Sequence, residues 1–168
     1  YISNAGAVSF GGIGGTAGDG GDVTVTHTGD ITTHGIGAYG IFAQSIGGGG
    51  GNGGETTIGV QEAGIDVARN HFGGHSGDGG DVTINSSGTI NLLGGGALGI
   101  FAQSIGGGGG TFGSANGLGF FGAMGGEGEA GRVIVNHSGA LITAGYNAIA
   151  FFAQSLGTSF APASPIGR

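Results

Sequence analysis

One segment of this chain, an aromatic-bearing strand followed by five glycines, occurs twice in full and a third time in shortened form. It runs from Ile41 to Gly51, returns from Ile100 to Gly110, and returns shortened from Phe151 to Gly157. A strand-like stretch precedes each copy at the same distance, so the units are offset by 59 residues (41 to 100) and then by 51 (101 to 152). A repeat of this length, built from short β-type runs and glycine turns, predicts a solenoid.

Glycine supplies 48 of the 168 residues, whereas an average protein has about 7%. Collagen is excluded because there is no Gly-X-Y period and proline occurs only at Pro162 and Pro165. The composition is also the opposite of a disordered chain, since 38% of the residues are hydrophobic and only 8% are charged. We therefore expect an ordered protein with glycine at its corners.

Three short runs in each unit have the alternation and the β-branched content of β-strands. In the first unit Val23 and Val25 alternate with threonine, a second run follows Gly29, and the third is Ile41–Ile46. No segment has helical spacing of apolar residues, and each glycine would cost a helix about 1 kcal/mol. The pattern predicts an all-β fold in which these runs form one coil of a three-faced parallel β-helix.

The chain divides into one solenoid of unequal units, with a partial repeat at 1–21, repeats at 22–80 and 81–131, a truncated repeat at 132–160 and a tail at 161–168. It starts and stops within the pattern, so we expect a fragment of a longer protein. The variable segments, 52–75 and 111–127, are expected to form one further coil each or a loop. Counting them as coils gives six to eight coils, a rod on the order of 30–40 Å at about 4.8 Å per stacked strand.

Stacking in register places equivalent side chains over one another, because one coil cannot bury its apolar side alone. Two inward columns are expected, one of large apolar residues and one of alanines: Ile41, Ile100 and Phe151, and Ala43, Ala102 and Ala153. Val23, Val82 and Val133 form a further predicted column. The five-glycine runs are expected at tight corners, where positive φ carries no penalty for glycine.

Two polar residues also recur once in each unit, as Gln44, Gln103 and Gln154 and as Ser45, Ser104 and Ser155. A catalytic residue is needed once per site, whereas these occur in every unit. We therefore interpret both sets as structural ladders of hydrogen bonds along the stack, in the manner of stacked amides.

A Gly-Asp-Gly-Gly-Asp motif at 18–22 and 77–81 partly matches the calcium-binding nonapeptide of other β-helices. The third copy carries Arg132 in place of the second aspartate. A turn whose aspartate caps backbone amides is the favoured interpretation, and calcium binding at Asp78 and Asp81 is left open.

Other chemistry has little support in the sequence. The histidines do not repeat in register, with His27 expected one position away from the equivalent of His137. The glycine runs lack the Lys-Ser/Thr ending of a phosphate loop, the carboxylates are scattered, and cysteine is absent. A net charge of −7 with only three basic residues argues against nucleic acid. We expect no enzyme, no catalytic residue, no metal and no cofactor.

The run from Asp22 to Thr33, and above all Ala43-Gln44-Ser45-Ile46 with its five glycines, resembles the passenger region of large Gram-negative autotransporters. The resemblance implies a right-handed parallel β-helix outside the cell, at the bacterial surface, held through a C-terminal β-barrel that is not in this sequence. We expect an adhesin-like, non-catalytic stalk whose partners are neighbouring repeats of the same longer chain and a host or bacterial surface ligand. The alternative is a self-assembling extracellular filament whose subunits associate end to end.

Overall fold

The computed structural model describes residues 14–52, 73–109 and 127–157, and the backbone of three short strands outside these ranges. These residues contain strands and no helix. The nine main strands are β2 (Val23–Thr28), β3 (Ile31–Thr33), β4 (Tyr39–Ile46), β6 (Val82–Ser87), β7 (Ile90–Leu92), β8 (Leu98–Ile105), β10 (Val133–Ser138), β11 (Leu141–Thr143) and β12 (Ile149–Leu156). The short strands are β1 (Val8–Ser9), β5 (Thr56–Ile58) and β9 (Ala115–Asn116).

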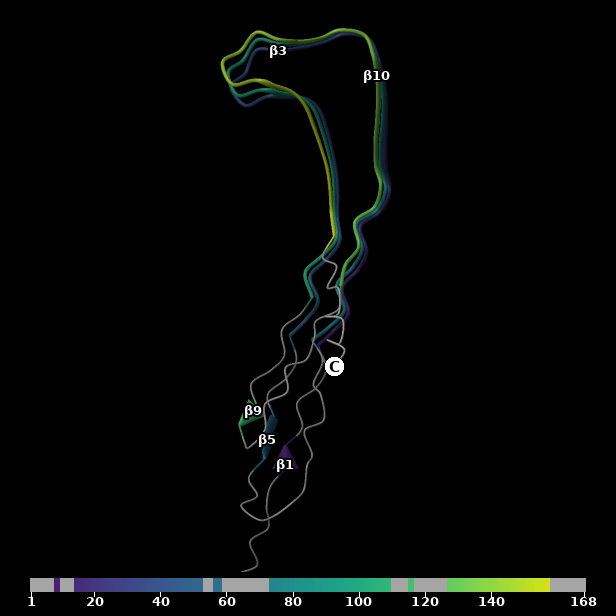
Figure 1. The fold of residues 1–168 in the computed structure, drawn as a ribbon, viewed down its shortest axis with the longest axis vertical. Helices are drawn as coiled ribbons and strands as arrows, with labels where there is room; N and C mark the ends of the chain where they lie inside the picture. Colours follow the sequence, from purple (N-terminus) through teal and green to yellow (C-terminus); the bar gives the residue numbers. More distant parts are fainter. Residues whose placement is uncertain are drawn as a thin grey trace, which may run out of the picture.

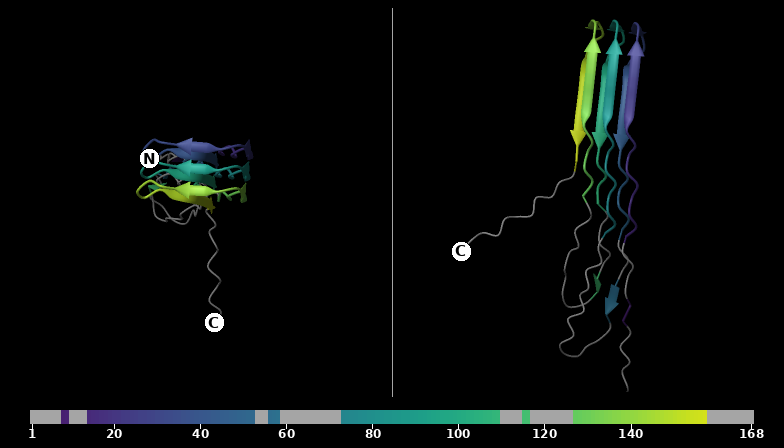
Figure 2. Two further views of the ribbon diagram at one scale, coloured as in Figure 1. Left: turned by 90° about the horizontal axis from the view of Figure 1, so that it is seen from above. Right: turned by 90° about the vertical axis from the view of Figure 1, so that its right-hand side faces the viewer.

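The nine main strands form three parallel sheets, each with one strand from each repeat. Their orders are β10-β6-β2, β11-β7-β3 and β12-β8-β4, so the second repeat is central in every sheet. Each repeat therefore forms one layer: the first layer is 14–52, the second 73–109 and the third 127–157. Figure 2 shows the three layers stacked, and in Figure 1 they superimpose along the stack. The short strands form a separate sheet in which β1 is antiparallel to β5 and β5 is parallel to β9.

The register of the sheets is the one that the two offsets predict. Val82 pairs with Val23 on one side and with Val133 on the other. Ala102 pairs in the same way with Ala43 and Ala153. Since a shift of one residue would turn every inward side chain outward, this register fixes which residues form the core.

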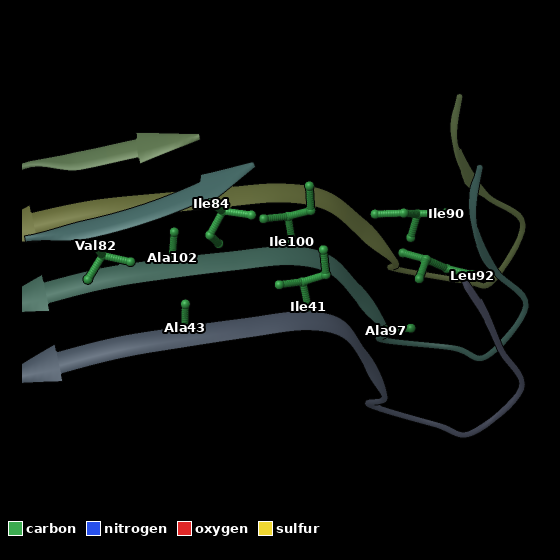
Figure 3. Packing of buried hydrophobic residues seen from close by; sticks show 9 residues of the cluster. All are labelled: Ile41, Ala43, Val82, Ile84, Ile90, Leu92, Ala97, Ile100 and Ala102. Carbon is green, nitrogen blue, oxygen red and sulfur yellow. The ribbon is translucent and has the colours of Figure 1, made fainter. Parts of the chain in front are cut away.

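The core lies inside the second layer, because only that layer has a neighbour on both sides. Its inward side chains are almost fully buried: Val82, Ile84, Leu92, Ile100 and Ala102 are 0% exposed and Ile90 is 1% exposed. Figure 3 shows them packed with Ile41, Ala43 and Ala97 between the sheets. Within the described residues, this central layer is the part of the stack with a complete hydrophobic core.

The corners between strands use residues with positive φ, as the punctuating glycines of each unit predicted. Gly29, Gly88 and Gly139 join the first and second strands of their layers with φ of 124°, 111° and 135°. The turn before the third strand places Gly37, Gly96 and Asn147 at φ of 67°, 65° and 54°. These two corners give each layer its bend around β3, β7 and β11, at the end labelled β3 in Figure 1.

The five-glycine runs are not such corners, and that prediction is wrong. None of the described glycines in 47–52 or 106–109 has positive φ. They are extended, and with 14–21, 73–80 and 127–131 they form the region where the two walls of each layer approach one another below the sheets in Figure 1. We call these five segments the glycine neck.

Hydrogen bonds in the glycine neck recur every third residue. Gly48 and Gly51 donate to the carbonyls of Gly18 and Gly15 at 3.0 and 2.9 Å, within the first layer. Gly74 and Gly77 of the second layer donate to Gly51 and Gly48 at 2.7 and 2.9 Å. A period of three, extended backbone and bonds only to neighbouring segments indicate polyproline II-like helices packed side by side.

This packing explains why the glycine neck needs glycine. A Cβ on Gly77 would overlap the carbonyl oxygen of Gly18 in the layer before, and one on Gly47 would overlap that of Gly77. In the first wall of the second layer, from residue 73 to 81, only every third residue is exposed to solvent, at His75, Asp78 and Asp81. The Gly-Asp-Gly-Gly-Asp motif is therefore the sequence of a threefold helix with a single free face.

Each repeat contributes one layer to the described structure, so it contains three layers and not six to eight. The larger number assumed a further coil in each of the variable segments. Most of 52–75 and 111–127 lies outside the described residues, and so do 1–7 and the tail 161–168.

Candidate functional site

The three glutamines form a continuous column on the outer face of the β12-β8-β4 sheet. Gln44 Nε2 donates to Gln103 Oε1, and Gln103 Nε2 donates to Gln154 Oε1, both at 2.6 Å. All three side chains are half-buried. The amides thus bond to one another along the stack, which is the arrangement that the repeat predicts.

A column of aromatic rings stands beside the glutamines on the same outer face. Phe42 and Phe101 stack with ring centroids 4.8 Å apart, and Phe101 and Phe152 with centroids 5.0 Å apart. Tyr39 meets Phe42 and Phe101 edge to face. Both faces of the Phe101 ring are therefore covered by the rings of Phe42 and Phe152. The repeat of Phe at one position of each unit was the sequence signal for this column.

The serine column points inward and joins the sheets to the glycine neck. Ser45 Oγ donates to the carbonyl of Gly21 at 2.8 Å in its own layer and accepts from the amide of Gly80 at 2.9 Å in the next. Ser104 Oγ repeats this with the carbonyl of Gly80 and the amide of Gly131, both at 2.9 Å.

Two of the three serines are buried and bonded to backbone groups of two layers. Ser45 is 4% exposed and Ser104 is 0% exposed, so neither meets solvent freely. Each of these two hydroxyls bonds to backbone groups on both sides, whereas a nucleophilic serine needs a base within hydrogen-bond reach. Ser155 Oγ keeps only the bond to Gly131 O, at 2.9 Å, because its layer has one neighbour.

The expected large apolar column is in register, but its members differ in burial. Ile100 is 0% exposed and Ile41 is 7% exposed, whereas Phe151 is 48% exposed. The alanine column behaves alike, since Ala43 and Ala102 are buried and Ala153 is exposed. Phe151 and Ala153 lie in the third layer, and among the described residues no further layer covers their strand.

The aspartates of the Gly-Asp-Gly-Gly-Asp motif cap backbone amides, but those of the following layer and not of a turn of their own. The carboxylates of Asp19 and Asp22 accept the amides of Asp78 and Asp81 at 2.9 and 2.8 Å. Asp78 and Asp81 in turn accept the amides of Glu129 and Arg132 at 2.8 and 2.7 Å. One carboxylate oxygen of each aspartate is thus engaged in holding the next layer.

No group of three or more His, Cys, Asp or Glu side chains that could hold a metal ion occurs in the described parts of the chain. The two aspartates for which calcium was left open, Asp78 and Asp81, lie three residues apart on the outer face of the glycine neck. The same described residues contain no helix that is long and apolar enough to cross a membrane.

The histidines form a column that the sequence reasoning missed. His27 and His137 both pair with Ser86, so they are exact equivalents and not one position apart. Ser86 Oγ lies 2.8 Å from His137 Nδ1, and the Nε2 atoms of both histidines are buried without a hydrogen-bond partner. Counting both offsets along the chain, 59 and 51 residues, was the signal that could have found this column.

A polar hollow of about 520 Å³ lies at this end of the β10-β6-β2 sheet. Its lining residues are Thr26, His27, Thr28, Asn85, Ser86, Ser87, Val135, Asn136, His137 and Ser138. None of them is a carboxylate, so the Ser86–His137 contact lacks the acid that orients a catalytic histidine. Asn136 Nδ2 donates to Asn85 Oδ1 at 2.9 Å, which adds a second amide pair along the stack.

The chain matches no protein-family model, no curated protein and no solved structure.

Proposed function

We propose that this chain is a segment of a right-handed parallel β-solenoid that serves as a non-catalytic stalk. The observation that carries the proposal is the register, because each of the nine main strands pairs with its equivalent in the neighbouring repeat. The right-handed course is the hand that parallel strands joined by crossovers take in about 98% of cases. Such a chain gains length by adding repeats, with stability shared between neighbours.

The distribution of polar groups supports a structural role over a catalytic one. The recurring polar side chains bond along the stack or to the backbone of the next layer: the glutamines, the inward serines and the aspartates of the glycine neck. A catalytic centre would instead bring different groups together at one place. An enzyme of the polysaccharide-cleaving β-helix kind would need clustered carboxylates or a basic residue in a groove, and the lining of the polar hollow contains no Asp, Glu, Lys or Arg.

The location that we propose is the outside of a Gram-negative cell, within the passenger of a surface-anchored adhesin-like autotransporter. The resemblance of the repeats supports it, together with the net charge of −7 and the absence of cysteine. In this setting the stalk holds more distant binding regions away from the membrane. Its partners are neighbouring repeats and, through those regions, a host or bacterial surface ligand.

A series of variants with one, two and three additional copies of residues 22–80, inserted between Gly80 and Asp81, tests the stalk. Each copy should lengthen the stack by about 4.8 Å with an unchanged cross-section, and the urea m-value should rise in equal steps. Small-angle scattering and urea unfolding measure both. Copies that behave as separate globules on a string would refute the proposal. Protease treatment of intact cells making the full-length parent protein tests the location, where resistance would contradict surface exposure.

A second candidate is the self-assembling filament subunit. Among the described strands it is supported by the open edges at both ends of the stack, since β2, β3 and β4 and likewise β10, β11 and β12 each pair on one side only; the methyl group of Ala150, considered below, opposes it. Open strand edges promote association unless they are blocked.

A further inference from the structure

Four glycines of the first layer have no structural reason to be glycine within the described stack. A Cβ on Gly15, Gly18 or Gly21 would meet nothing within 4 Å, and one on Gly35 would meet only Ala38 Cβ at an ordinary 3.6 Å. Their φ angles lie outside the left-handed range, so the backbone does not require glycine either. Glycine nevertheless costs about 0.5–1 kcal/mol relative to alanine in regular structure.

The equivalent glycines of the second layer are indispensable, and for one common reason. A Cβ on Gly74, Gly77 or Gly94 would overlap the carbonyl of Gly15, Gly18 or Gly35 in the layer before. A Cβ on Gly80 would come within 2.6 Å of the carbonyl oxygen of Gly21. The same requirement recurs in the third layer, at Gly131 against Gly80 and at Gly145 against Gly94. At these positions of the wall, the glycine of each layer faces the preceding layer.

We infer that the free face of the first layer, at Gly15, Gly18, Gly21 and Gly35, is a docking surface for one further layer of the same repeat. Its glycines then face the backbone carbonyls of that further layer, as Gly74, Gly77, Gly80 and Gly94 face the carbonyls of the first layer. The apolar side chains on that face agree, because Val23, Val25 and Ile31 are only half-buried against the core. The inference rests on the stacked stalk proposed above, and it specifies which kind of layer this face accepts.

The partner layer must itself have glycine at one position of the opposite wall. At this one position the glycine faces the following layer: a Cβ on Gly40 would come within 2.5 Å of Gly99 O, and one on Gly99 would overlap Ala150 O. The third layer carries Ala150 at this position. A layer like the first cannot sit on the third without a collision between the Ala150 methyl and the carbonyl of Gly40.

Ala150 therefore prevents a second copy of this chain from being the partner. The other columns would continue across such a contact, with Phe152 over Phe42 and Gln154 over Gln44. Arg132 would lie over Asp22, so opposite charges would meet. The free face of the first layer therefore accepts a repeat layer that has glycine at the position of Gly40 and Gly99. The methyl group of Ala150 stops the chain from polymerising head to tail.

The test converts the second copy into a suitable partner with Ala150→Gly. Sedimentation equilibrium should show a monomer for the unchanged chain. For Ala150→Gly, the weight-average mass should at least roughly double over about a tenfold rise in concentration. An unchanged chain that already polymerises head to tail, or an Ala150→Gly variant that stays monomeric, would overturn the inference.

Two matched variants show that association uses the inferred face. Gly21→Ala in the Ala150→Gly background should abolish it, because the new methyl group meets Gly131 of the partner copy. Gly108→Ala should leave it intact, because a Cβ there meets nothing within 4 Å and Gly108 lies in the second layer. Alone, Gly21→Ala should shift the melting temperature by about 2 °C or less. Association that survives Gly21→Ala, for example through the outer face with Phe42, would count against the inference.

These results separate the inference from the stalk itself. If the chains with inserted repeats do not lengthen as a stack, the stalk proposal fails. If they do lengthen while Ala150→Gly has no effect on association, only the inference fails.

Discussion

The sheeted part of each layer and the glycine neck are two halves of one cross-section, and they are held together by different forces. The sheets enclose an apolar core in which Ile84 and Ile100 are 0% exposed. The glycine neck has backbone against backbone, with bonds such as that from Gly77 N to Gly48 O at 2.9 Å. The packing of the sheets therefore requires large apolar side chains, whereas the packing of the glycine neck requires glycine, which has no side chain.

The largest expected effect is in the sheets. Ile84→Ala removes a side chain that is 0% exposed and leaves a cavity between layers, which should lower the free energy of unfolding by about 2–5 kcal/mol. Its equivalent in the first layer, Val25, is half-buried, so Val25→Ala should cost about 1 kcal/mol. Urea unfolding followed by circular dichroism measures both. Equal losses would mean that the second layer has no special role as the core.

The next effect is in the glycine neck. Gly77→Ala places a methyl group against the carbonyl of Gly18, and overpacking of this kind should cost about 1–3 kcal/mol or more. Gly18→Ala is the matched control, since its Cβ meets nothing within 4 Å, and it should stay within about 0.5 kcal/mol of the unchanged chain. A neck that tolerates both substitutions equally would refute close packing of its helices.

The smallest effect is at the junction of the two regions. Ser104→Ala removes the hydroxyl between Gly80 O and Gly131 N, leaving two backbone groups without this partner at a cost of about 1–2 kcal/mol. Ser155→Ala loses one bond at an exposed site, so about 0.5 kcal/mol or less is expected. If the two serines cost the same, the hydroxyl does not join neighbouring layers.

The two regions also differ in how much the sequence revealed. In the sheets, alternation around Val23 and Val25 predicted the strands, and the two offsets predicted which residues pair. Hydrophobic alternation is a direct record of burial on a pleated surface, so it survives in a single sequence. The same two offsets, 59 and 51 residues, place His27 and His137 in one column.

The glycine neck was misjudged because its segments bury mainly glycine backbone, with Ser76 as a buried side chain, so no hydrophobic alternation marks them in the sequence. Glycine runs are compatible with corners, loops and close packing, and φ distinguishes them only in the structure. The usable signal was the three-residue spacing of Asp19 and Asp22, repeated at Asp78 and Asp81, which was interpreted as a turn. The sequence also did not reveal which end of the stack accepts another layer. That depends on whether the methyl group of Ala150 would collide with a backbone carbonyl of the next layer.

The unequal length of the two repeats has a practical consequence for design. The first two layers are 59 residues apart and the next two 51 apart, yet Gln103 bonds to Gln44 and to Gln154 at the same 2.6 Å. The stack thus tolerates eight more or fewer residues between layers without any change in alignment. Foreign peptides grafted between Asn52 and Gly73, or between Gly109 and Glu127, should therefore leave the three sheets in register, so each repeat offers one place for an insert.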